Sequence, residues 1–409
     1  MSAVSAFAGV ELFLNPALDE RADYPEVCRA VLNREGYRAA FQRISAWPGY
    51  RPTELVVLPG LARSCGVASV RYKDESSRFG LGSFKALGGA YAVSRVLEAE
   101  ARRRSGRDHI GLETLLAGQI AELRDLTVTC ATDGNHGRSV AWAAQMFGCR
   151  CVIYVHATVS EGRKRAIEAY GATVIRSGGN YDQSVRQAQA DAQQNGWLLI
   201  SDASHEDYEE VPRYVMQGYA VMAQEALDAM SAPPTHLFLQ AGVGGMAAAV
   251  AAHLWEKLGE RRPRVVICEP DRAACLYASA RAGAPVAVPG SLDTIMAGLA
   301  CGEVSALAWT VLAPAAAAFM TLPDELARVS MRLLAAGIDG DPPLVAGESA
   351  VAGFAGLLAV AGRREWRAAL GLEPDSRVLL FGTEGDTDPA LYREIVGWSA
   401  EEVRKRVPT

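Results

Sequence analysis

The sequence predicts an α/β fold of two domains, in which helices cover both faces of parallel sheets. From about residue 126 onward, short apolar stretches alternate with amphipathic stretches of helical periodicity. The apolar stretches are short and rich in β-branched residues, which is typical of strands buried in a parallel sheet. A chain of 409 residues also exceeds the size of one simple core, so we expect a large domain and a smaller one.

The predicted strands are regularly spaced and separated by predicted helices. They cover residues 126–131, 151–155, 173–175, 197–200, 236–239, 265–268 and 378–381. Helices are predicted at 161–170 and 181–194, and Gly171 marks the end of the first. We place a smaller α/β domain at residues 86–208, inserted into a larger domain formed by residues 1–85 plus 209–409.

Composition narrows the possible functions. A formal net charge of −6 and a pI near 5.7 argue against a nucleic-acid surface. The first residues do not resemble a signal peptide, and the longest apolar stretches are too short or too rich in glycine and alanine to span a bilayer. We therefore expect a soluble, cytoplasmic protein. The eight cysteines lack zinc-type spacing, so no metal site is expected, although Cys275 and Cys301 could meet in space.

Residues 83–90 carry one lysine, Lys85, in an otherwise uncharged run of small and apolar residues. Loss of hydration disfavours an ammonium group, so we expect the pKa of Lys85 to be lowered. A neutral amine can form a Schiff base with a carbonyl cofactor. Alternatively, Lys85 is an ordinary lysine that reaches solvent from the start of a helix.

Three turns that follow predicted strands carry polar groups, and ligands bind at this end of parallel strands. The first is the turn at 132–137, where Asn135 could grip a planar ligand and Asp133 could act as an acid or base. Alternatively, this turn only caps the following helix. The third turn, residues 382–389, is dense in hydroxyls and carboxylates and could bind a ring nitrogen or lie on the surface.

The second turn, residues 241–246, is rich in glycine and precedes an alanine-rich helix. Its backbone N–H groups can converge on a phosphate at the start of that helix. The residues concerned are Gly242, Val243, Gly244, Gly245 and Met246. The spacing does not match the G-x-G-x-x-G fingerprint of dinucleotide-binding folds. A lysine, an asparagine turn, a phosphate site and a hydroxyl turn together describe one ligand, pyridoxal phosphate.

Several motifs also resemble those of fold-type II pyridoxal-phosphate enzymes, the tryptophan synthase β and threonine dehydratase superfamily. The resemblance is closest to the diaminopropionate ammonia-lyase family, because aspartate replaces serine at the start of the asparagine turn. The motifs lie in the expected order at residues 73–85, 131–138, 216–219, 296–303 and 383–389.

This resemblance implies how the cofactor is bound. Lys85 would form the Schiff base with the cofactor, and Phe84 would pack near its ring. Asn135 would hold the phenolic oxygen, residues 242–246 the phosphate, and Thr383 the pyridine nitrogen. The resemblance also implies a homodimer.

The resemblance further implies α,β-elimination of 2,3-diaminopropionate to pyruvate and ammonia. Asp133 would be the base for one enantiomer, and Asp202 would lie near the β-amino group, whose positive charge it would pair with. Asp202 has an alternative interpretation as a helix cap. His136 is interpreted as structural, with proton relay as the alternative.

Two other functions are weighed. A dehydratase acting on serine, threonine or a 3-substituted serine would share every cofactor contact, but its hydroxyl leaving group would not need the two aspartates. A nicotinamide-binding Rossmann protein would need a glycine fingerprint followed by an acidic residue, and the sequence has neither. The sequence departs from the family pattern at Gly82, 205–207 and 347–350, which bears on substrate choice.

Overall fold

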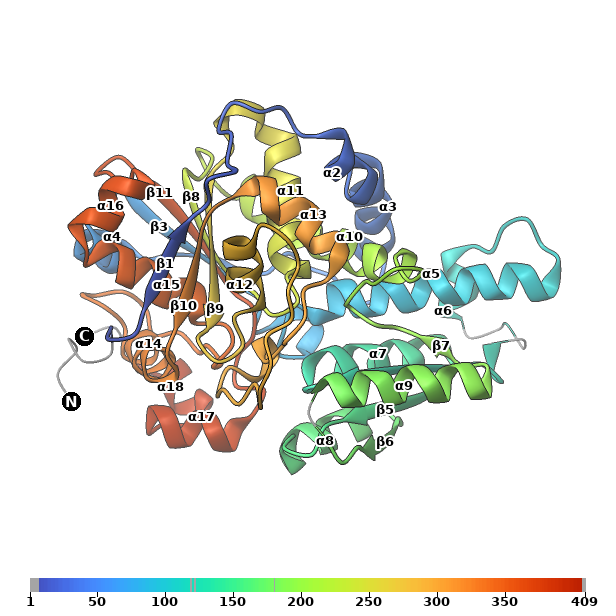
Figure 1. Cartoon of the computed structure of the whole chain (residues 1–409). Helices are drawn as coiled ribbons and strands as arrows, with labels where there is room; N and C mark the ends of the chain where they lie inside the picture. The colour runs from blue at the N-terminus through green and yellow to red at the C-terminus, as the bar shows by residue number, and fades with distance from the viewer. Residues whose placement is uncertain (1–6, 118–119, 121–122, 180, 407–409) are drawn as a thin grey trace. The chain divides into compact units, whose positions relative to one another are not determined.

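The computed structural model describes residues 7–117, 120, 123–179 and 181–406 (Figure 1). The chain forms two compact units. Unit 1 comprises Met1–Arg34, Pro52–Phe84 and Met222–Thr409, and unit 2 comprises Glu35–Arg51 and Lys85–Val221. Residues 35–51 pack with unit 2, where the ring of Trp47 meets the edge of Trp142 at a centroid distance of 6.0 Å. The domain limits predicted from sequence, 1–85 plus 209–409 and 86–208, stay a prediction.

Unit 1 is built on a seven-stranded sheet with the order β1-β10-β9-β8-β11-β3-β2. The five inner strands are mutually parallel, and the edge strands β1 and β2 are antiparallel to their neighbours. The strands are β1 (Glu11–Leu14), β2 (Leu55–Val57), β3 (Ser69–Asp74), β8 (His236–Gln240), β9 (Arg264–Pro270), β10 (Ala316–Leu322) and β11 (Arg377–Gly382).

Burial explains why these segments occupy the centre or the edge of the sheet. All residues of β8 and β10 are buried, as expected for strands covered on both faces. The edge strands are more exposed: β1 has two exposed and two partly buried residues, and β2 has one buried, one partly buried and one exposed residue. Strands β8, β9 and β11 were predicted from the sequence, whereas β1, β2, β3 and β10 were not. Strand β10 begins with three alanines, which have little intrinsic preference for strands.

Helices cover the sheet of unit 1, and α15 lies against β8, β9, β10 and β11. The helices of unit 1 are α2 (Glu26–Val31), α4 (Pro59–Cys65), α11 (Gly245–Leu258), α12 (Cys275–Ala282), α13 (Ala306–Ala315), α14 (Asp324–Ala336), α15 (Ala352–Ala361), α16 (Arg364–Leu370), α17 (Pro389–Val396) and α18 (Ala400–Arg404). Short 3-10 turns lie at Arg78–Gly80, Gly259–Arg261 and Ala297–Leu299.

Unit 2 contains a four-stranded sheet, entirely parallel, with the order β6-β5-β4-β7. The chain moves outward from β4 to β6 and then returns to the opposite edge at β7. Right-handed crossovers therefore place α7 and α8 on one face and α9 on the other. The strands are β4 (Thr127–Thr132), β5 (Arg150–Val155), β6 (Thr173–Arg176) and β7 (Leu198–Leu199). All four strands were predicted from the sequence.

The helices of unit 2 include a long one that begins at Lys85. They are α3 (Arg34–Ser45), α5 (Lys85–Ser105), α6 (Leu112–Leu116), α7 (Asn135–Phe147), α8 (Glu161–Glu168) and α9 (Tyr181–Asn195), and α10 (Glu210–Asp228) is divided between the two units. Within the described ranges, no helix combines the length and the apolar character that crossing a membrane requires.

A buried cluster of charged side chains in unit 1 anchors the segment that leads to Lys85. The Lys73 ammonium lies 2.7 Å from the Glu225 carboxylate, and the Arg78 guanidinium lies 2.6 Å from the same carboxylate. Arg78 also binds Glu75 at 2.8 Å. Burial opposes ionisation of Glu225, but the hydrogen bonds and charges of Arg78 and Lys73 outweigh it and hold the pKa of Glu225 below its ordinary value.

We predict that Glu225→Ala lowers the free energy of unfolding by about 3–5 kcal/mol, because Lys73 and Arg78 would remain buried with less compensating charge. Urea unfolding followed by circular dichroism measures this change. Glu401→Ala is the control, since its ion pair with Lys405 is exposed and such pairs contribute about 0–1 kcal/mol. Equal losses in the two variants would contradict the prediction.

Candidate active site

The turn after β4 is shaped by Thr132. The hydroxyl oxygen of Thr132 accepts hydrogen bonds from the backbone N–H groups of Gly134 and Gly137, both at 2.9 Å. Gly134 has a φ of +151°, and a Cβ on Gly137 would lie 2.4 Å from the Thr132 methyl group. Thr132 therefore bonds the N–H groups at the start of α7, so the turn does cap this helix, and the role of Asp133 as an acid or base stays a prediction.

Lys85 is the first residue of α5, and its side chain forms an ion pair within unit 2. Its Nζ lies 2.7 Å from the Oδ2 atom of Asp202, and both side chains are mostly buried. Asp202 lies in a bend between β7 and α10, so it does not cap a helix and the alternative interpretation is wrong. The pair places an amine and a carboxylate in direct contact.

The ion pair reverses the expected pKa of Lys85. Burial disfavours the ammonium, but the charges of Asp202 and its neighbours and the hydrogen bond to Asp202 together outweigh burial, and the pKa of Lys85 lies well above its ordinary value. Likewise, burial disfavours the Asp202 carboxylate, but the charge of Lys85, together with the neighbouring groups and the hydrogen bonds to the carboxylate, holds the pKa of Asp202 well below its ordinary value. The expectation of a lowered lysine pKa was wrong because it considered desolvation without the partner that the fold supplies.

Two further residues of the asparagine turn belong to the surroundings of this ion pair. The negative charge of Asp133 contributes to the raised pKa of Lys85, and the Asp133 carbonyl accepts a hydrogen bond from Arg163 at 3.3 Å. His136 Nε2 lies 2.7 Å from the carbonyl oxygen of Ile200, so this nitrogen carries the proton. Its Nδ1 lies 4.0 Å from Asp202. Burial lowers the pKa of His136, so the ring is neutral at pH 7.

The position of Lys85 is further restricted by close packing of α5 on α10 within unit 2. A Cβ on Gly218 would lie 2.0 Å from the carbonyl oxygen of Leu87, and a Cβ on Gly88 would lie 2.4 Å from the ring of Tyr219. The Lys85 ammonium lies 5.9 Å from the centroid of that ring. Only glycine fits at these two positions, and the contact holds the first turn of α5 in place.

The glycine-rich turn of unit 1 leads into α11. Gly244 has a φ of +96° and precedes the first helical residue, Gly245. The first N–H groups of a helix have no carbonyl partner within the helix, so they are available to an anion. A Cβ on Gly242 would lie 3.0 Å from the sulfur of Cys301, which leaves little room for a side chain. Cys275 and Cys301 are both free thiols.

The turn after β11 is buried, so its interpretation as a surface turn is wrong. Thr383 and Glu384 are 4% and 3% exposed. The Thr383 carbonyl accepts the N–H of Phe84 at 3.0 Å, and the Gly82 carbonyl accepts the N–H of Gly385 at 2.9 Å. Lys85 therefore directly follows a residue that is fixed to the Thr383 turn.

The structure brings Lys85, Asp133 and Asp202 together in unit 2, and Phe84 next to Thr383 in unit 1. Asn135 begins α7. Sequence reasoning missed Thr132, Tyr219 and Gln240, the last of which donates a hydrogen bond to Thr383 at 2.8 Å. Each lies inside or beside a motif that was identified, so proximity to those motifs was the available signal.

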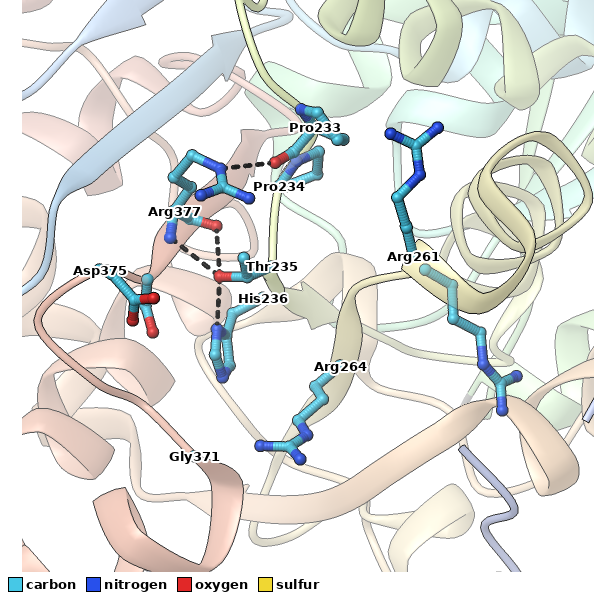
Figure 2. Close-up of a pocket in the computed structure, with 11 residues that line it drawn as sticks. Pro233, Pro234, Thr235, His236, Arg261, Arg264, Gly371, Asp375 and Arg377 are labelled. Atoms are coloured by element: carbon cyan, nitrogen blue, oxygen red, sulfur yellow. Dashed lines mark hydrogen bonds between the residues drawn. The ribbon is translucent and has the colours of Figure 1, made fainter. Parts of the chain in front are cut away.

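A separate pocket of about 450 Å³ lies in unit 1 where β8 and β11 begin (Figure 2). Four arginines line it, and Thr235 bonds both His236 and the N–H of Arg377 at 2.8 Å. The predicted site residues do not line this pocket. Ligands of parallel α/β sheets bind where the strands end, so this pocket is not the candidate active site.

Comparison with known proteins identifies similar sequences. Residues 46–384 match the family model described as pyridoxal-phosphate dependent enzyme. The diaminopropionate ammonia-lyase of Escherichia coli K12 is 42% identical over 358 residues, which cover 85% of this chain and 88% of that protein. The enzyme of the same name from Salmonella typhimurium is 40% identical over 360 residues, which cover 85% and 89%.

Solved structures agree with these sequence matches. The E. coli diaminopropionate ammonia-lyase in complex with an aminoacrylate-PLP azomethine reaction intermediate matches with a TM-score of 0.84 and 38% identity. The match covers 95% of this chain and 96% of that one. Tomato threonine deaminase isoform 2 matches with a TM-score of 0.68 at 18% identity, which indicates a shared fold only.

We predict that Asp202→Asn lowers the pKa of Lys85, because the substitution removes the charge that stabilises the ammonium. In cofactor-free protein, reductive methylation of Lys85, followed by peptide mass spectrometry over a pH series, reports the neutral amine. The midpoint of the methylation profile against pH should move to lower pH in the variant.

The matched control is Asp191→Asn, the same substitution in the same unit at a residue that bonds Tyr154. This variant should keep the wild-type pH profile of Lys85 methylation. A profile unchanged in Asp202→Asn would show that Asp202 does not set the pKa of Lys85.

Proposed function

Because the chain belongs to the family of pyridoxal-phosphate-dependent enzymes and, within it, to the diaminopropionate ammonia-lyases, we propose that it converts 2,3-diaminopropionate and water into pyruvate and ammonia. The observation that carries this proposal is the 2.7 Å ion pair of Lys85 and Asp202, with the charge of Asp133 acting on the same ammonium. The carboxylates of Asp202 and Asp133 near the Lys85 amine can pair with positive charge. This suits a substrate that carries amino groups on adjacent carbons.

The residues present fit pyridoxal phosphate. Lys85 offers the amine that binds its aldehyde carbon, and the start of α11 offers backbone N–H groups to its phosphate. We assign the phosphate to residues 242–246, the phenolic oxygen to Asn135 and the ring nitrogen to Thr383. Phe84 would pack near the ring. When bound, the cofactor supplies an electron sink for negative charge at the substrate Cα.

Lys85 and Asp202 would manage a proton between them. When it is not bound to the cofactor, the Lys85 Nζ would be free to take up and release protons. At 2.7 Å, the Asp202 carboxylate stabilises its ammonium form and orients it. Asp202 would also pair with the positively charged β-amino group and hold it until it leaves.

Asp133 would act from the turn that precedes α7. We propose that its carboxylate removes the Cα proton of one enantiomer of the substrate, while Lys85 serves the other. Thr132 fixes the backbone of this turn and thereby orients Asp133. One structure of the E. coli enzyme is a complex with D-serine, so that relative has a site that admits a D-amino acid.

We predict that the protein reconstituted with pyridoxal phosphate releases pyruvate from 2,3-diaminopropionate with a kcat/KM about 10²-fold or more above that for serine or threonine. The hydroxyl group of serine or threonine would leave the carboxylates of Asp133 and Asp202 without a cationic partner. A coupled lactate dehydrogenase assay measures pyruvate. Comparable rates on serine would instead support the dehydratase alternative.

We further predict that Asp133→Asn lowers turnover of one diaminopropionate enantiomer by about 10²–10⁴-fold, the usual contribution of a general base, and the other far less. The same pyruvate assay with each pure enantiomer tests this. Asp191→Asn should leave both rates at the wild-type level. Equal losses on both enantiomers would refute the stereochemical role of Asp133.

We also propose that the enzyme is a cytoplasmic homodimer with a large domain of residues 1–85 plus 209–409 and a smaller one of 86–208. Family resemblance supports the dimer, and light scattering after gel filtration tests it.

A further inference from the structure

Gln240 connects two strand ends in unit 1. It is the last residue of β8, which lies beside β11 (Figure 1). Its side chain is 2% exposed. Its Nε2 lies 2.7 Å from the carbonyl oxygen of Phe381, 2.8 Å from the hydroxyl oxygen of Thr383 and 3.3 Å from the carbonyl oxygen of Ala350. No role for Gln240 was predicted from the sequence.

The chemistry of these neighbours fixes which way the Gln240 amide points. Backbone carbonyl oxygens only accept hydrogen bonds, so the group facing Phe381 and Ala350 must be the NH₂ group. A reversed amide would place its oxygen against two other acceptors. The shorter contacts use the two amide hydrogens, one to Phe381 and one to the hydroxyl oxygen of Thr383.

This contact determines what the Thr383 hydroxyl can do. A hydroxyl that accepts a hydrogen bond from Gln240 keeps its own hydrogen for donation elsewhere. Across the part of the chain that the structure describes, Thr383 donates this hydrogen to no protein acceptor, although its side chain is buried. A buried donor without a partner is costly, so a ligand acceptor is expected there.

We propose that Gln240 is a positioning residue that makes Thr383 a hydrogen-bond donor toward the pyridine nitrogen and so keeps that nitrogen unprotonated. The proposal rests on the proposed cofactor and its contact with Thr383. A protonated ring nitrogen would need a hydrogen-bond acceptor. The Thr383 hydroxyl could accept that hydrogen bond only if its own hydrogen were left without a partner.

The other end of the amide supports a specific role for Gln240. Its Oε1 is buried without a hydrogen-bond partner among the described residues. A Cβ on Gly353 would lie 3.0 Å from this oxygen and 2.3 Å from the carbonyl oxygen of Phe238, so Gly353 leaves the space that the amide occupies. An apolar side chain at position 240 would leave no unbonded oxygen. The presence of the amide is therefore explained by the hydrogen bonds that its N–H groups donate.

Gln240→Glu tests the proposal because it nearly preserves shape and reverses the hydrogen bond. The buried carboxyl of the variant would keep its proton, which it donates to the carbonyl oxygen of Phe381, and the same oxygen would accept the hydrogen of Thr383. This turns a lone pair of the Thr383 hydroxyl toward the ring nitrogen and favours protonation of that nitrogen. The probe is pyridoxal phosphate labelled with ¹⁵N in the ring, and the readout is the ¹⁵N chemical shift in wild type and variant.

In wild type we expect the ¹⁵N resonance of an unprotonated pyridine, and in Gln240→Glu an upfield shift toward that of a protonated pyridine. Conversion of the bound cofactor to pyridoxamine phosphate during turnover should also increase. Gln224→Glu is the matched control, a partly buried glutamine of α10 that bonds Asp228 and His253, and it should keep the wild-type resonance.

A protonated ring nitrogen in wild type would overturn the proposal, as would an unchanged resonance in Gln240→Glu. If Gln240→Glu does not fold, Gln240→Met, which removes the amide donor at a similar side-chain length, takes its place, and an unchanged ¹⁵N resonance in that variant would overturn the proposal. Failure to bind pyridoxal phosphate would overturn the proposed function together with this inference. Cofactor binding without pyruvate release would reject only the substrate, because the ¹⁵N shift needs no turnover.

Discussion

The candidate site depends on the short antiparallel contact between residues 82–84 and 383–385. Its hydrogen bonds join Phe84 to Thr383 and Gly385 to Gly82. Gly82 itself adopts a φ of +76°, and Phe79 a φ of +51°, so this approach requires backbone conformations that few residues adopt easily. The buried cluster around Arg78 stabilises the same segment. Lys85 follows Phe84 directly, so a single peptide bond links the lysine to a residue that is hydrogen-bonded to the turn after β11.

Electrostatics within unit 2 then sets the state of the lysine. Asp202 and Lys85 stabilise each other's charged form, and the neutral imidazole of His136 adds no competing charge. In the proposed reaction the lysine must be an amine when it binds the cofactor and an acid or base afterwards. A carboxylate in direct contact lets it take up a proton at that site without moving to solvent.

Sequence patterns located most of the parallel strands and the loops that follow them, because buried strands and glycine-rich turns leave local signals. They did not reveal β10, whose alanines lack a strand signal, or the edge strands, which are short. Lys85, Asp133 and Asp202 were identified, but the raised pKa of Lys85 depends on a partner 117 residues away. Gln240 was missed because a glutamine at a strand end is unremarkable until its three acceptors are known.

The contact between Gly88 and Gly218 has a consequence for attempts to change the substrate range of this protein. Backbone meets backbone there, so neither glycine tolerates a side chain and the first turn of α5 cannot slide or rotate along α10. Mutant libraries designed to accept new leaving groups should therefore leave these two positions unchanged. The segment 205–207, which departs from the family pattern and lies just after Asp202, offers exposed side chains where diversity can be introduced while the lysine stays in register.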